Sequence, residues 1–314
     1  MKKLFFYQNP IQWSWLVPWL CYCRRLGVPL VLVGGCIRDW LLSRRVVEID
    51  AVALLSNFHP EALSKALIHF LPETKGPYIL KGTKDVRYHY VHHGLGLSFD
   101  ILPLRGNTLK EDLRLRDFTI NACIGLPGQN QALVIHDPLG LGIKDLTEKK
   151  IMTPKDPLAT LLDDPIRSIR ALRLCHTLDF TLEPWFQATI RESLAKGILK
   201  RVSIERVRQE LERILMDCSI ELERLVMDIR MLGLDKALAA MLAVSYENGR
   251  SPTSKRTTLT FQALPMLPWL RMGVLLRLLF GEGEVPERGL LLLGYAKKRV
   301  RLFRRILDKT LKSF

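Results

Sequence analysis

The apolar residues of this chain change their spacing at about residue 164, and this change constrains the fold more than any other feature. Before it, short apolar runs bounded by turn residues predict buried strands at 29–33, 49–54 and 97–102, with a short helix over 37–42. After it, apolar residues recur at helical spacing and almost no alternation remains. The sequence therefore predicts an α+β fold, with a small mixed-sheet head followed by an all-helical neck, body and tail.

The charge and composition limit the class of protein. The 314 residues include 47 Lys and Arg against 32 Asp and Glu, which gives a net charge of +15, and 48 % are hydrophobic. The hydrophobic share permits sizeable cores and argues against wholesale disorder. The basic excess favours a polyanionic partner, bound by phosphate neutralisation and counterion release. A generic basic surface is the simpler alternative.

Cysteine usage and hydropathy favour a reducing, aqueous compartment. None of the six cysteines forms a Cys-x-x-Cys pair, so we expect buried free thiols and no zinc site. His89, His92 and His93 lie close together, but no cysteine or further histidine is near them, and we expect no metal site there. No apolar run reaches the roughly 18 residues of a membrane span. We therefore expect a cytoplasmic protein without a membrane partner.

A double glycine follows the first predicted strand. Gly34 and Gly35 precede the short helix, and Arg38 comes one turn later. Without a Cβ, the backbone N–H groups can approach a phosphate at the start of a helix, and Arg38 could hold a triphosphate oxygen. A purely structural turn would have the same residues, so this motif alone decides nothing.

Three acidic residues follow on the next predicted strands. Glu48 and Asp50 are two residues apart and point to one face of a strand, and Asp100 offers a third carboxylate. Adjacent carboxylates repel, and a divalent cation would relieve the repulsion. Mg²⁺ prefers oxygen ligands and is usually held by one or two carboxylates plus substrate phosphates. The set suits two-metal phosphoryl transfer, with a solvated sheet edge as the alternative.

Five motifs in a fixed order resemble those of the class II tRNA nucleotidyltransferase and bacterial poly(A) polymerase family. They occupy residues 32–39 with 48–50, then 111–122, 136–140 with 144–146, 163–173, and 202–207 with 210–211. The resemblance covers residues 32 to 211, and nothing is recognised beyond about residue 215. It implies a polymerase-β-like nucleotidyltransferase head at 1–146, a helical neck with a base-recognition motif at 147–215, and a body and basic tail for RNA binding at 216–314.

The resemblance also implies an activity. It would be the template-independent, Mg²⁺-dependent addition of CMP, AMP or both to the 3′ end of tRNA, from CTP and ATP. An enzyme that adds only the two C residues and a poly(A) polymerase share these motifs and stay open. A catalytically silent RNA-binding relative is an alternative of another class.

The first two motifs imply roles for five residues. Glu48 and Asp50 match the acids that bind the catalytic metals. Arg116, Asp117 and Asn121 match residues near the sugar and phosphates, where they help to distinguish ribose from deoxyribose. On one helix, Asp117 and Asn121 would share a face because they are four residues apart.

The fourth motif implies recognition of the base. Asp164 and Arg167 match residues that pair with the edge of the incoming base, where a carboxylate accepts and a guanidinium donates. Locally, Asp164 followed by Pro165 also predicts an N-cap. Arg170 and Arg173 continue a row from Arg167 that suits phosphates of the nucleotide, or else forms a solvated cationic face.

The C-terminal segment predicts an amphipathic helix with a basic outer face. Its candidate RNA-binding residues are Lys297, Lys298, Arg301, Arg304 and Arg305. A membrane-surface helix is the competing interpretation. Residues 247–256 form the best candidate linker, because Asn-Gly and Ser-Pro pairs fall within them.

The chain departs from the family pattern in places. Glu48 replaces the first metal-binding aspartate, Leu115 replaces an arginine and Asp163 a glutamate, while Ser43 stands where the family usually has glycine. Mg²⁺ tolerates geometric error poorly, so the longer Glu48 side chain could alter catalysis. The stretch 105–112 is very short, where complete CCA-adding members have a longer flexible loop. Relatives that add only the two C residues tend to lack this loop, so the resemblance keeps a CC-adding enzyme open as an alternative.

Overall fold

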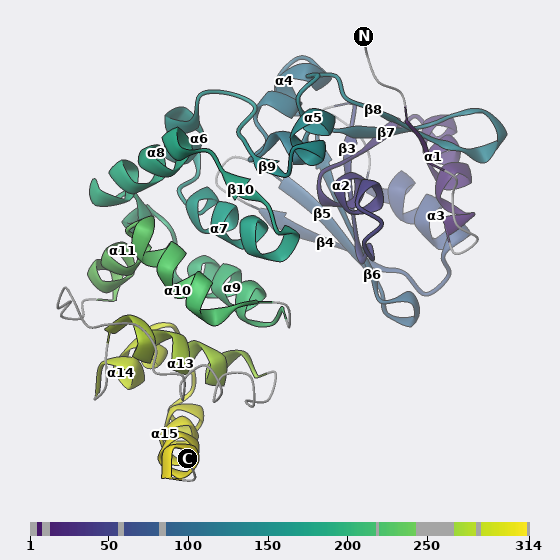
Figure 1. The fold of residues 1–314 in the computed structure, drawn as a ribbon. Coiled ribbons are helices and arrows are strands. Elements are labelled where there is room, and N and C mark those ends of the chain that lie inside the picture. Colours follow the sequence, from purple (N-terminus) through teal and green to yellow (C-terminus); the bar gives the residue numbers. More distant parts are fainter. Residues whose placement is uncertain are drawn as a thin grey trace. The chain divides into compact units, whose positions relative to one another are not determined.

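The chain divides into two compact units, residues 1–155 and 156–314, in the computed structural model of Figure 1. The structure describes residues 5–7, 13–55, 60–81, 86–217, 220–242, 267–280 and 284–312. The first unit contains an eight-stranded sheet, and the second consists mainly of helices. The predicted α+β fold is confirmed. The predicted linker at 247–256 lies outside the described residues.

A mixed sheet in the order β1-β8-β7-β2-β3-β6-β5-β4 forms the centre of the first unit. Its strands are β1 (Phe5–Tyr7), β2 (Leu30–Val33), β3 (Glu48–Ala53), β4 (Lys75–Lys81), β5 (Val86–His92), β6 (Leu97–Pro103), β7 (Ile124–Pro127) and β8 (Leu133–His136). β3 and β6 pair in parallel, and the other described pairings in this sheet are antiparallel. The three strands predicted from the sequence match β2, β3 and β6 to within one residue at either end.

Helices cover the sheet unequally. The first unit contains α1 (Leu16–Arg25), α2 (Gly35–Leu41), α3 (Pro60–Phe70), α4 (Leu109–Arg114) and α5 (Gly142–Thr147), and a two-residue strand, β9 (Lys150–Ile151). α1 and α3 pack on one sheet face in a core that includes Trp19 and Phe99. On the opposite face, Val33 and Val52 pack in a smaller cluster with Leu113. Because strand side chains alternate, Asp50 points to this second face.

The second unit is built from amphipathic helices. They are α6 (Pro157–Asp163), α7 (Arg167–Leu178), α8 (Pro184–Ala195), α9 (Ile204–Leu215), α10 (Leu222–Met231), α11 (Leu234–Met241), α13 (Pro268–Phe280), α14 (Glu284–Leu292) and α15 (Lys297–Lys312), with the short strand β10 (Thr181–Leu182). On α9, Val207, Leu211 and Ile214 are buried, as their helical spacing predicts. On α15, Phe303 is buried against Gly273 of α13, where a Cβ would come within 2.3 Å of its ring.

The described cysteines are free thiols, as expected. They are Cys21, Cys23, Cys36, Cys123 and Cys175, while Cys218 lies outside the described residues. Burial raises the pKa of the Cys23 and Cys175 thiols to about 12, so both stay protonated at neutral pH. Within the described ranges, no helix has both the length and the apolar character needed to cross a membrane.

Candidate active site

Glu48, Asp50 and Asp100 converge on the second face of the sheet. One carboxylate oxygen from each lies within 4.8 Å of those of the other two. Asp50 and Asp100 are direct partners across the parallel β3–β6 pair, and Glu48 is two residues from Asp50 on the same face. Asp100 is buried, Asp50 half-buried and Glu48 exposed. Three carboxylates this close repel one another, so the cluster could hold a divalent metal ion.

The surroundings of Asp50 fit a bound cation. Burial raises the pKa of Asp50 above its ordinary value, the charge of Arg116 opposes that rise, and the nearby Asp100 adds to it. A metal ion would favour the charged form of such a carboxylate. The donor set is all oxygen, which is the ligand type that Mg²⁺ prefers over the softer transition metals.

The double glycine packs directly against Asp50. Gly34 has a φ of 77°, and a Cβ at this position would come within 2.7 Å of Asp50 Oδ2. The backbone N–H of Gly35 donates a hydrogen bond to Asp50. Glycine is therefore required at residue 34 for both its backbone conformation and the space that the carboxylate occupies.

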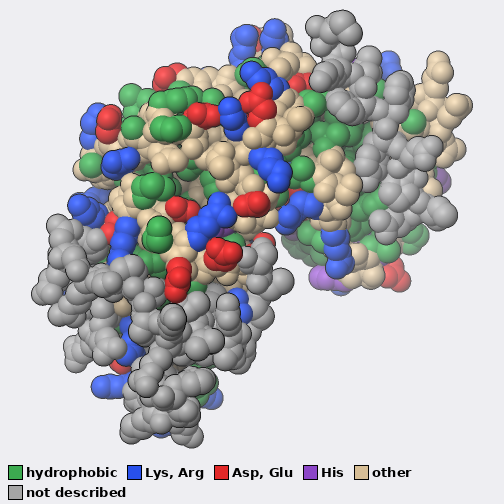
Figure 2. Space-filling view, viewed as in Figure 1, with side chains coloured by type: hydrophobic (Ala, Val, Ile, Leu, Met, Phe, Trp, Pro, Cys, Tyr) green, Lys and Arg blue, Asp and Glu red, His purple; other side chains and the backbone are tan. Residues whose placement is uncertain are grey.

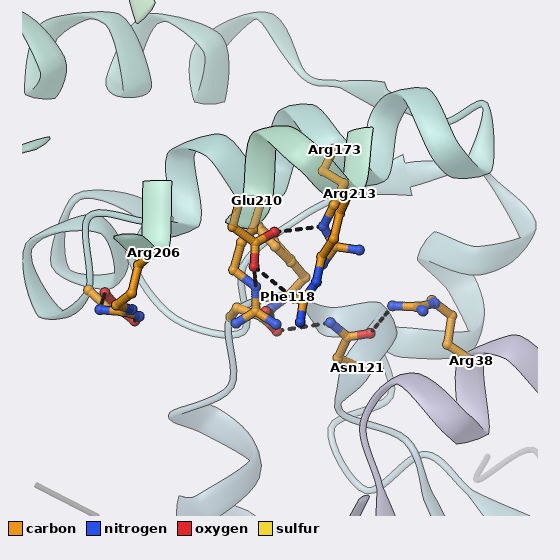
Figure 3. Close-up of polar contacts among 10 residues, drawn as sticks. Arg38, Phe118, Asn121, Arg173, Arg206, Glu210 and Arg213 are labelled. Atoms are coloured by element: carbon orange, nitrogen blue, oxygen red, sulfur yellow. Dashed lines mark hydrogen bonds and ion pairs between the residues drawn. The ribbon is translucent and has the colours of Figure 1, made fainter. Parts of the chain in front are cut away.

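Hydrogen bonds link Arg38 to two residues of the second motif (Figure 3). Arg38 Nη1 donates to Asn121 Oδ1 at 2.8 Å, and Asn121 Nδ2 donates to Asp117 Oδ1 at 2.9 Å. The other Arg38 nitrogens bond both carboxylate oxygens of Asp39, at 2.8 and 2.9 Å. The structure thus brings together three of the predicted nucleotide-binding residues and fixes the guanidinium of Arg38.

The second motif does not form a single helix, so the expectation that Asp117 and Asn121 share one helix face is wrong. α4 ends at Arg114, and residues 119–121 form a separate 3₁₀ turn. Between them Phe118 is extended, and its N–H donates to Asp117 Oδ1 at 2.9 Å. An aspartate that bonds the next backbone N–H in this way competes with helix formation. Asp117 and Asn121 meet through the turn instead of along a helix face.

A buried carboxylate that the sequence analysis did not single out holds Arg116. Asp112 accepts hydrogen bonds from Arg116 Nε at 3.2 Å and Nη2 at 2.9 Å, and from Arg105 Nε at 2.8 Å. Burial acts to raise the pKa of Asp112, but Arg116 and Arg105 outweigh it and hold the pKa below its ordinary value. Asp112 therefore fixes the guanidinium whose charge acts on Asp50.

Two basic residues of β5 contact the third carboxylate. Arg87 Nη1 lies 2.8 Å from Asp100 Oδ2, and His89 Nδ1 lies 2.7 Å from Asp100 Oδ1. Arg87 was not among the predicted site residues, and His89 was considered only for a histidine metal site of its own. Alternation along β5 would place Arg87 and His89 on one face, but the sequence does not reveal that β6 is the neighbouring strand.

Residues of the third motif hold the 3₁₀ turn of the second motif in place. Asp137 accepts from the N–H groups of Gly140 at 2.9 Å and Ile143 at 3.0 Å, which shapes the turn before α5. Thr119 Oγ1 then donates to Asp145 Oδ2 at 2.5 Å. These buried contacts anchor the 3₁₀ turn that carries Asn121.

Asp164 is not an N-cap, which corrects the local prediction. α7 begins at Arg167 and is preceded by Ile166, whereas Asp164 directly follows α6. The carboxylate of Asp164 instead accepts two hydrogen bonds from Arg206 of α9, at 3.1 and 2.7 Å. A charge-assisted, two-point pair is stronger than a cap to a neutral N–H. Arg167 is buried and donates to the carbonyl of Thr160 at 3.3 Å.

Two arginines of the α7 row, Arg170 and Arg173, lie near one acidic residue of α9, which also pairs with Arg213 of α9 itself (Figure 3). Glu210 accepts from Arg173 Nε at 2.7 Å and Arg213 Nη1 at 3.0 Å, and Arg170 Nε lies 3.8 Å away. With Arg167 buried and these two arginines near Glu210, the row is not a solvated cationic face. Three arginines around one glutamate leave an excess of positive charge, which is compatible with phosphate binding.

The predicted basic residues of α15 are exposed. Lys297, Lys298, Arg301, Arg304 and Arg305 all point to solvent, and Arg304 Nε lies 3.5 Å from Glu287. Figure 2 shows Lys and Arg side chains interspersed with Asp and Glu over the visible face of the helical unit. Binding of RNA by α15 stays a prediction.

Comparison with known proteins identifies the first unit. Residues 30–152 match the family model of the poly A polymerase head domain. The match to the head domain, together with the relatives and solved structures below, supports the resemblance of the chain to the class II tRNA nucleotidyltransferase family.

Relatives in this family add different nucleotides. The chain is 36 % identical over 192 residues to a CC-adding tRNA nucleotidyltransferase of Geobacter sulfurreducens, covering 61 % of this chain and 41 % of the relative. It is 35 % identical over 207 residues to an A-adding tRNA nucleotidyltransferase of Deinococcus radiodurans, covering 65 % of this chain and 43 % of the relative. The chain thus spans less than half the length of these two proteins.

Solved structures of the family share the fold. The Thermotoga maritima CCA-adding enzyme complexed with tRNA superposes with a TM-score of 0.71 at 24 % identity, over 96 % of this chain and 70 % of that one. A CCA-adding enzyme in complex with CTP gives a TM-score of 0.71 at 22 % identity, over 95 % of this chain and 70 % of that one. At these identities the likeness establishes the fold alone.

Proposed function

We propose that this chain is a Mg²⁺-dependent tRNA nucleotidyltransferase that adds CMP, AMP or both to the tRNA 3′ end. The observation that carries the proposal is the convergence of Glu48, Asp50 and Asp100 within 4.8 Å, against a double-glycine turn. The RNA 3′-oxygen attacks the α-phosphorus of the triphosphate, the bond to the bridging oxygen breaks, and pyrophosphate leaves.

Glu48 and Asp50 would hold the metal, with Asp100 as a third ligand. Bound Mg²⁺ would lower the pKa of the 3′-hydroxyl and neutralise the charge of the triphosphate. The fit rests on the all-oxygen donor set of the three converging carboxylates; a metal ion there would also oppose the burial that raises the pKa of Asp50.

The surrounding residues would orient the nucleotide. Arg38 and Arg116, each fixed by carboxylates, present rigid guanidinium groups suited to phosphate oxygens. Asp117 and Asn121 would contact the sugar. Within the second unit, a carboxylate at Asp164 and a guanidinium at Arg167 can accept from and donate to a base edge without a template strand. Arg170 and Arg173 would add positive charge for the triphosphate.

A preference for CTP alone is a second, narrower proposal. The connection between β6 and α4 is short, and Arg105 at its start is bonded through its backbone N–H and Nε to Asp112 at 3.3 and 2.8 Å. The 36 % identical relative is a CC-adding enzyme, which supports this version.

Residues 1–146 would act as the head, 147–215 as the neck, and 216–314 as the body and tail. α15 would bind the tRNA in the cytoplasm, electrostatically.

The proposal is tested by sequencing the 3′ ends of tRNA after incubation with CTP alone, ATP alone, or both, with Mg²⁺. Ends extended by two C residues with CTP alone, and no further by ATP, identify a CC-adding enzyme. Long A tails on RNA of any kind identify a poly(A) polymerase. If tRNA binds with steep salt dependence and no end is extended under any condition, the chain is a silent relative and the proposal is wrong.

A further inference from the structure

A row of cross-strand partners runs from the acidic cluster to the edge of the sheet. Asp50 of β3 pairs with Asp100 of β6, Asp100 with His89 of β5, and His89 with Tyr78 of β4. Direct partners point to the same face of a sheet. His89 Nδ1 lies 2.7 Å from Asp100 Oδ1, and the rings of His89 and Tyr78 are 6.4 Å apart. Contacts therefore continue from the candidate metal ligands to the outermost strand.

A second pair of cross-strand partners flanks this row on the same face of the sheet. Arg87 of β5 is two residues from His89 and pairs with Leu80 of β4. Tyr78 and Leu80 are each 50 % exposed, and the Arg87 side chain is 48 % exposed although Asp100 fixes one end of it. We call Tyr78, Leu80, Arg87 and His89 the β4–β5 platform. It offers an aromatic ring and a cationic group side by side, which is the chemistry that binds single-stranded nucleic acid.

The order of the strands determines what could reach this platform. The double-glycine turn follows β2 on one side of β3, whereas β6, β5 and β4 follow in order on the other side. In an in-line displacement, the attacking and leaving oxygens lie on opposite sides of the phosphorus. If pyrophosphate leaves toward the double-glycine turn, the RNA 3′-hydroxyl must approach from the side of β6 and β5.

We infer that the β4–β5 platform binds the 3′-terminal nucleotide of the RNA acceptor. Tyr78 stacks on the terminal base, and Arg87 contacts the adjacent phosphate while it remains paired with Asp100. Stacking accepts any base, so the platform would receive the changing end of a growing RNA. This inference rests on the proposed function, because the direction of approach assumes nucleotidyl transfer.

The test measures binding of a short, labelled, single-stranded RNA with a free 3′-hydroxyl to the full chain by fluorescence anisotropy. Tyr78→Ala should weaken binding by about five- to a hundredfold, the range of one lost base stack. Tyr78→Phe keeps the ring and should bind as the wild type does. Ile79→Ala is the matched control, because Ile79 is 53 % exposed on the same strand but points to the other face.

Arg87→Gln gives an independent test through the salt dependence of RNA binding. Loss of one phosphate contact to a single strand should flatten the slope of log Kd against log salt by about 0.7. In the transfer reaction, Tyr78→Ala should raise KM for RNA and leave KM for CTP unchanged. Unchanged RNA binding and slope in Tyr78→Ala and Arg87→Gln would overturn the inference, even if the wild type extends tRNA. If the wild-type protein extends no RNA, the proposed function is contradicted instead. The anisotropy measurement then still shows whether the β4–β5 platform binds RNA.

Discussion

Arg206 donates two hydrogen bonds to the carboxylate of Asp164, at 3.1 and 2.7 Å (Figure 3). The pair joins the start of α9 to the residue proposed to accept a hydrogen bond from the base. Two donors from one planar guanidinium fix the plane of a carboxylate and leave its outer lone pairs in a defined direction. Arg206 is therefore a positioning residue for Asp164 in the proposed nucleotide site.

Arg206→Met should raise KM for the nucleotide by about tenfold and reduce discrimination between CTP and ATP, because one misplaced hydrogen bond is worth about 1 kcal/mol or more. Arg206→Lys, which supplies charge without the planar fork, should recover part of the affinity but little of the discrimination. Steady-state kinetics with each nucleotide and tRNA measures both quantities.

The matched control for this prediction is Arg224→Met. Arg224 also pairs with aspartates in the second unit, but the Asp179 carboxylate is 74 % exposed and Asp228 lies 3.9 Å away. Exposed pairs contribute little to stability, so the variant should match the wild type in fold and kinetics. Equal nucleotide KM values in Arg206→Met and Arg224→Met would contradict a role for Arg206 in the nucleotide site.

Asp112→Asn should destabilise the first unit by about 3 kcal/mol at neutral pH, because Arg105 and Arg116 lose their shared buried partner. The pKa of Asp112 is lowered in the folded protein, so its stabilisation is complete above the ordinary carboxyl pKa near 3.9 and is lost as pH falls through the lowered value. The difference between variant and wild type in urea unfolding should be largest at neutral pH and should shrink as pH falls below about 4.

The exposed Asp179→Asn serves as the comparison for this pH dependence, since its pairing with Arg224 is open to solvent. A difference between Asp112→Asn and wild type that persists undiminished at pH 3 would show that the two arginines do not stabilise the ionised form.

Ser43→Gly should stabilise the first unit by roughly 0.5–1 kcal/mol. Ser43 follows the C-cap of α2 with a φ of 55°, a left-handed conformation that favours glycine. Ser43→Ala keeps a Cβ and should give no gain. Thermal unfolding of the three proteins tests this, and a variant with glycine that melts no higher than one with alanine would exclude backbone strain at this position.

Glu48→Asp should keep metal binding, while Glu48→Gln should weaken it about tenfold or more by removing one of three charges. Titration with Mn²⁺, followed by electron paramagnetic resonance, measures this without nucleotide or RNA. Glu183→Gln, which changes an acidic residue of the second unit, is the control. If Glu48→Gln binds Mn²⁺ as tightly as wild type, Glu48 is not a ligand.

Local rules predicted much of the site. Alternation along β3 placed Glu48 and Asp50 on one face, and apolar runs located β2, β3 and β6. The motifs, through their family resemblance, implied Asp164 and Arg167, whose role in recognising the base stays a proposal. These features depend on residues near each other in sequence or on a pattern of fixed order.

Contacts set by the tertiary fold could not be predicted. His89 meets Asp100 because β5 and β6 are neighbours in register, and Arg206 meets Asp164 across 42 positions of the chain. The helix expected through Asp117 failed because its own side chain bonds the next N–H, a local competition that helical spacing does not reveal.

The central claim is that the acidic cluster of β3 and β6 carries out nucleotidyl transfer. The most direct measurement is a single-turnover assay of labelled CMP or AMP transfer to tRNA lacking its 3′ end, with Mg²⁺, for wild type and Asp50→Asn, beside tRNA binding by both. We predict that the wild type transfers nucleotide, that the variant loses at least about a thousandfold in rate, and that both bind tRNA alike. Transfer by Asp50→Asn at the wild-type rate, or none by either protein despite bound tRNA, would contradict the claim.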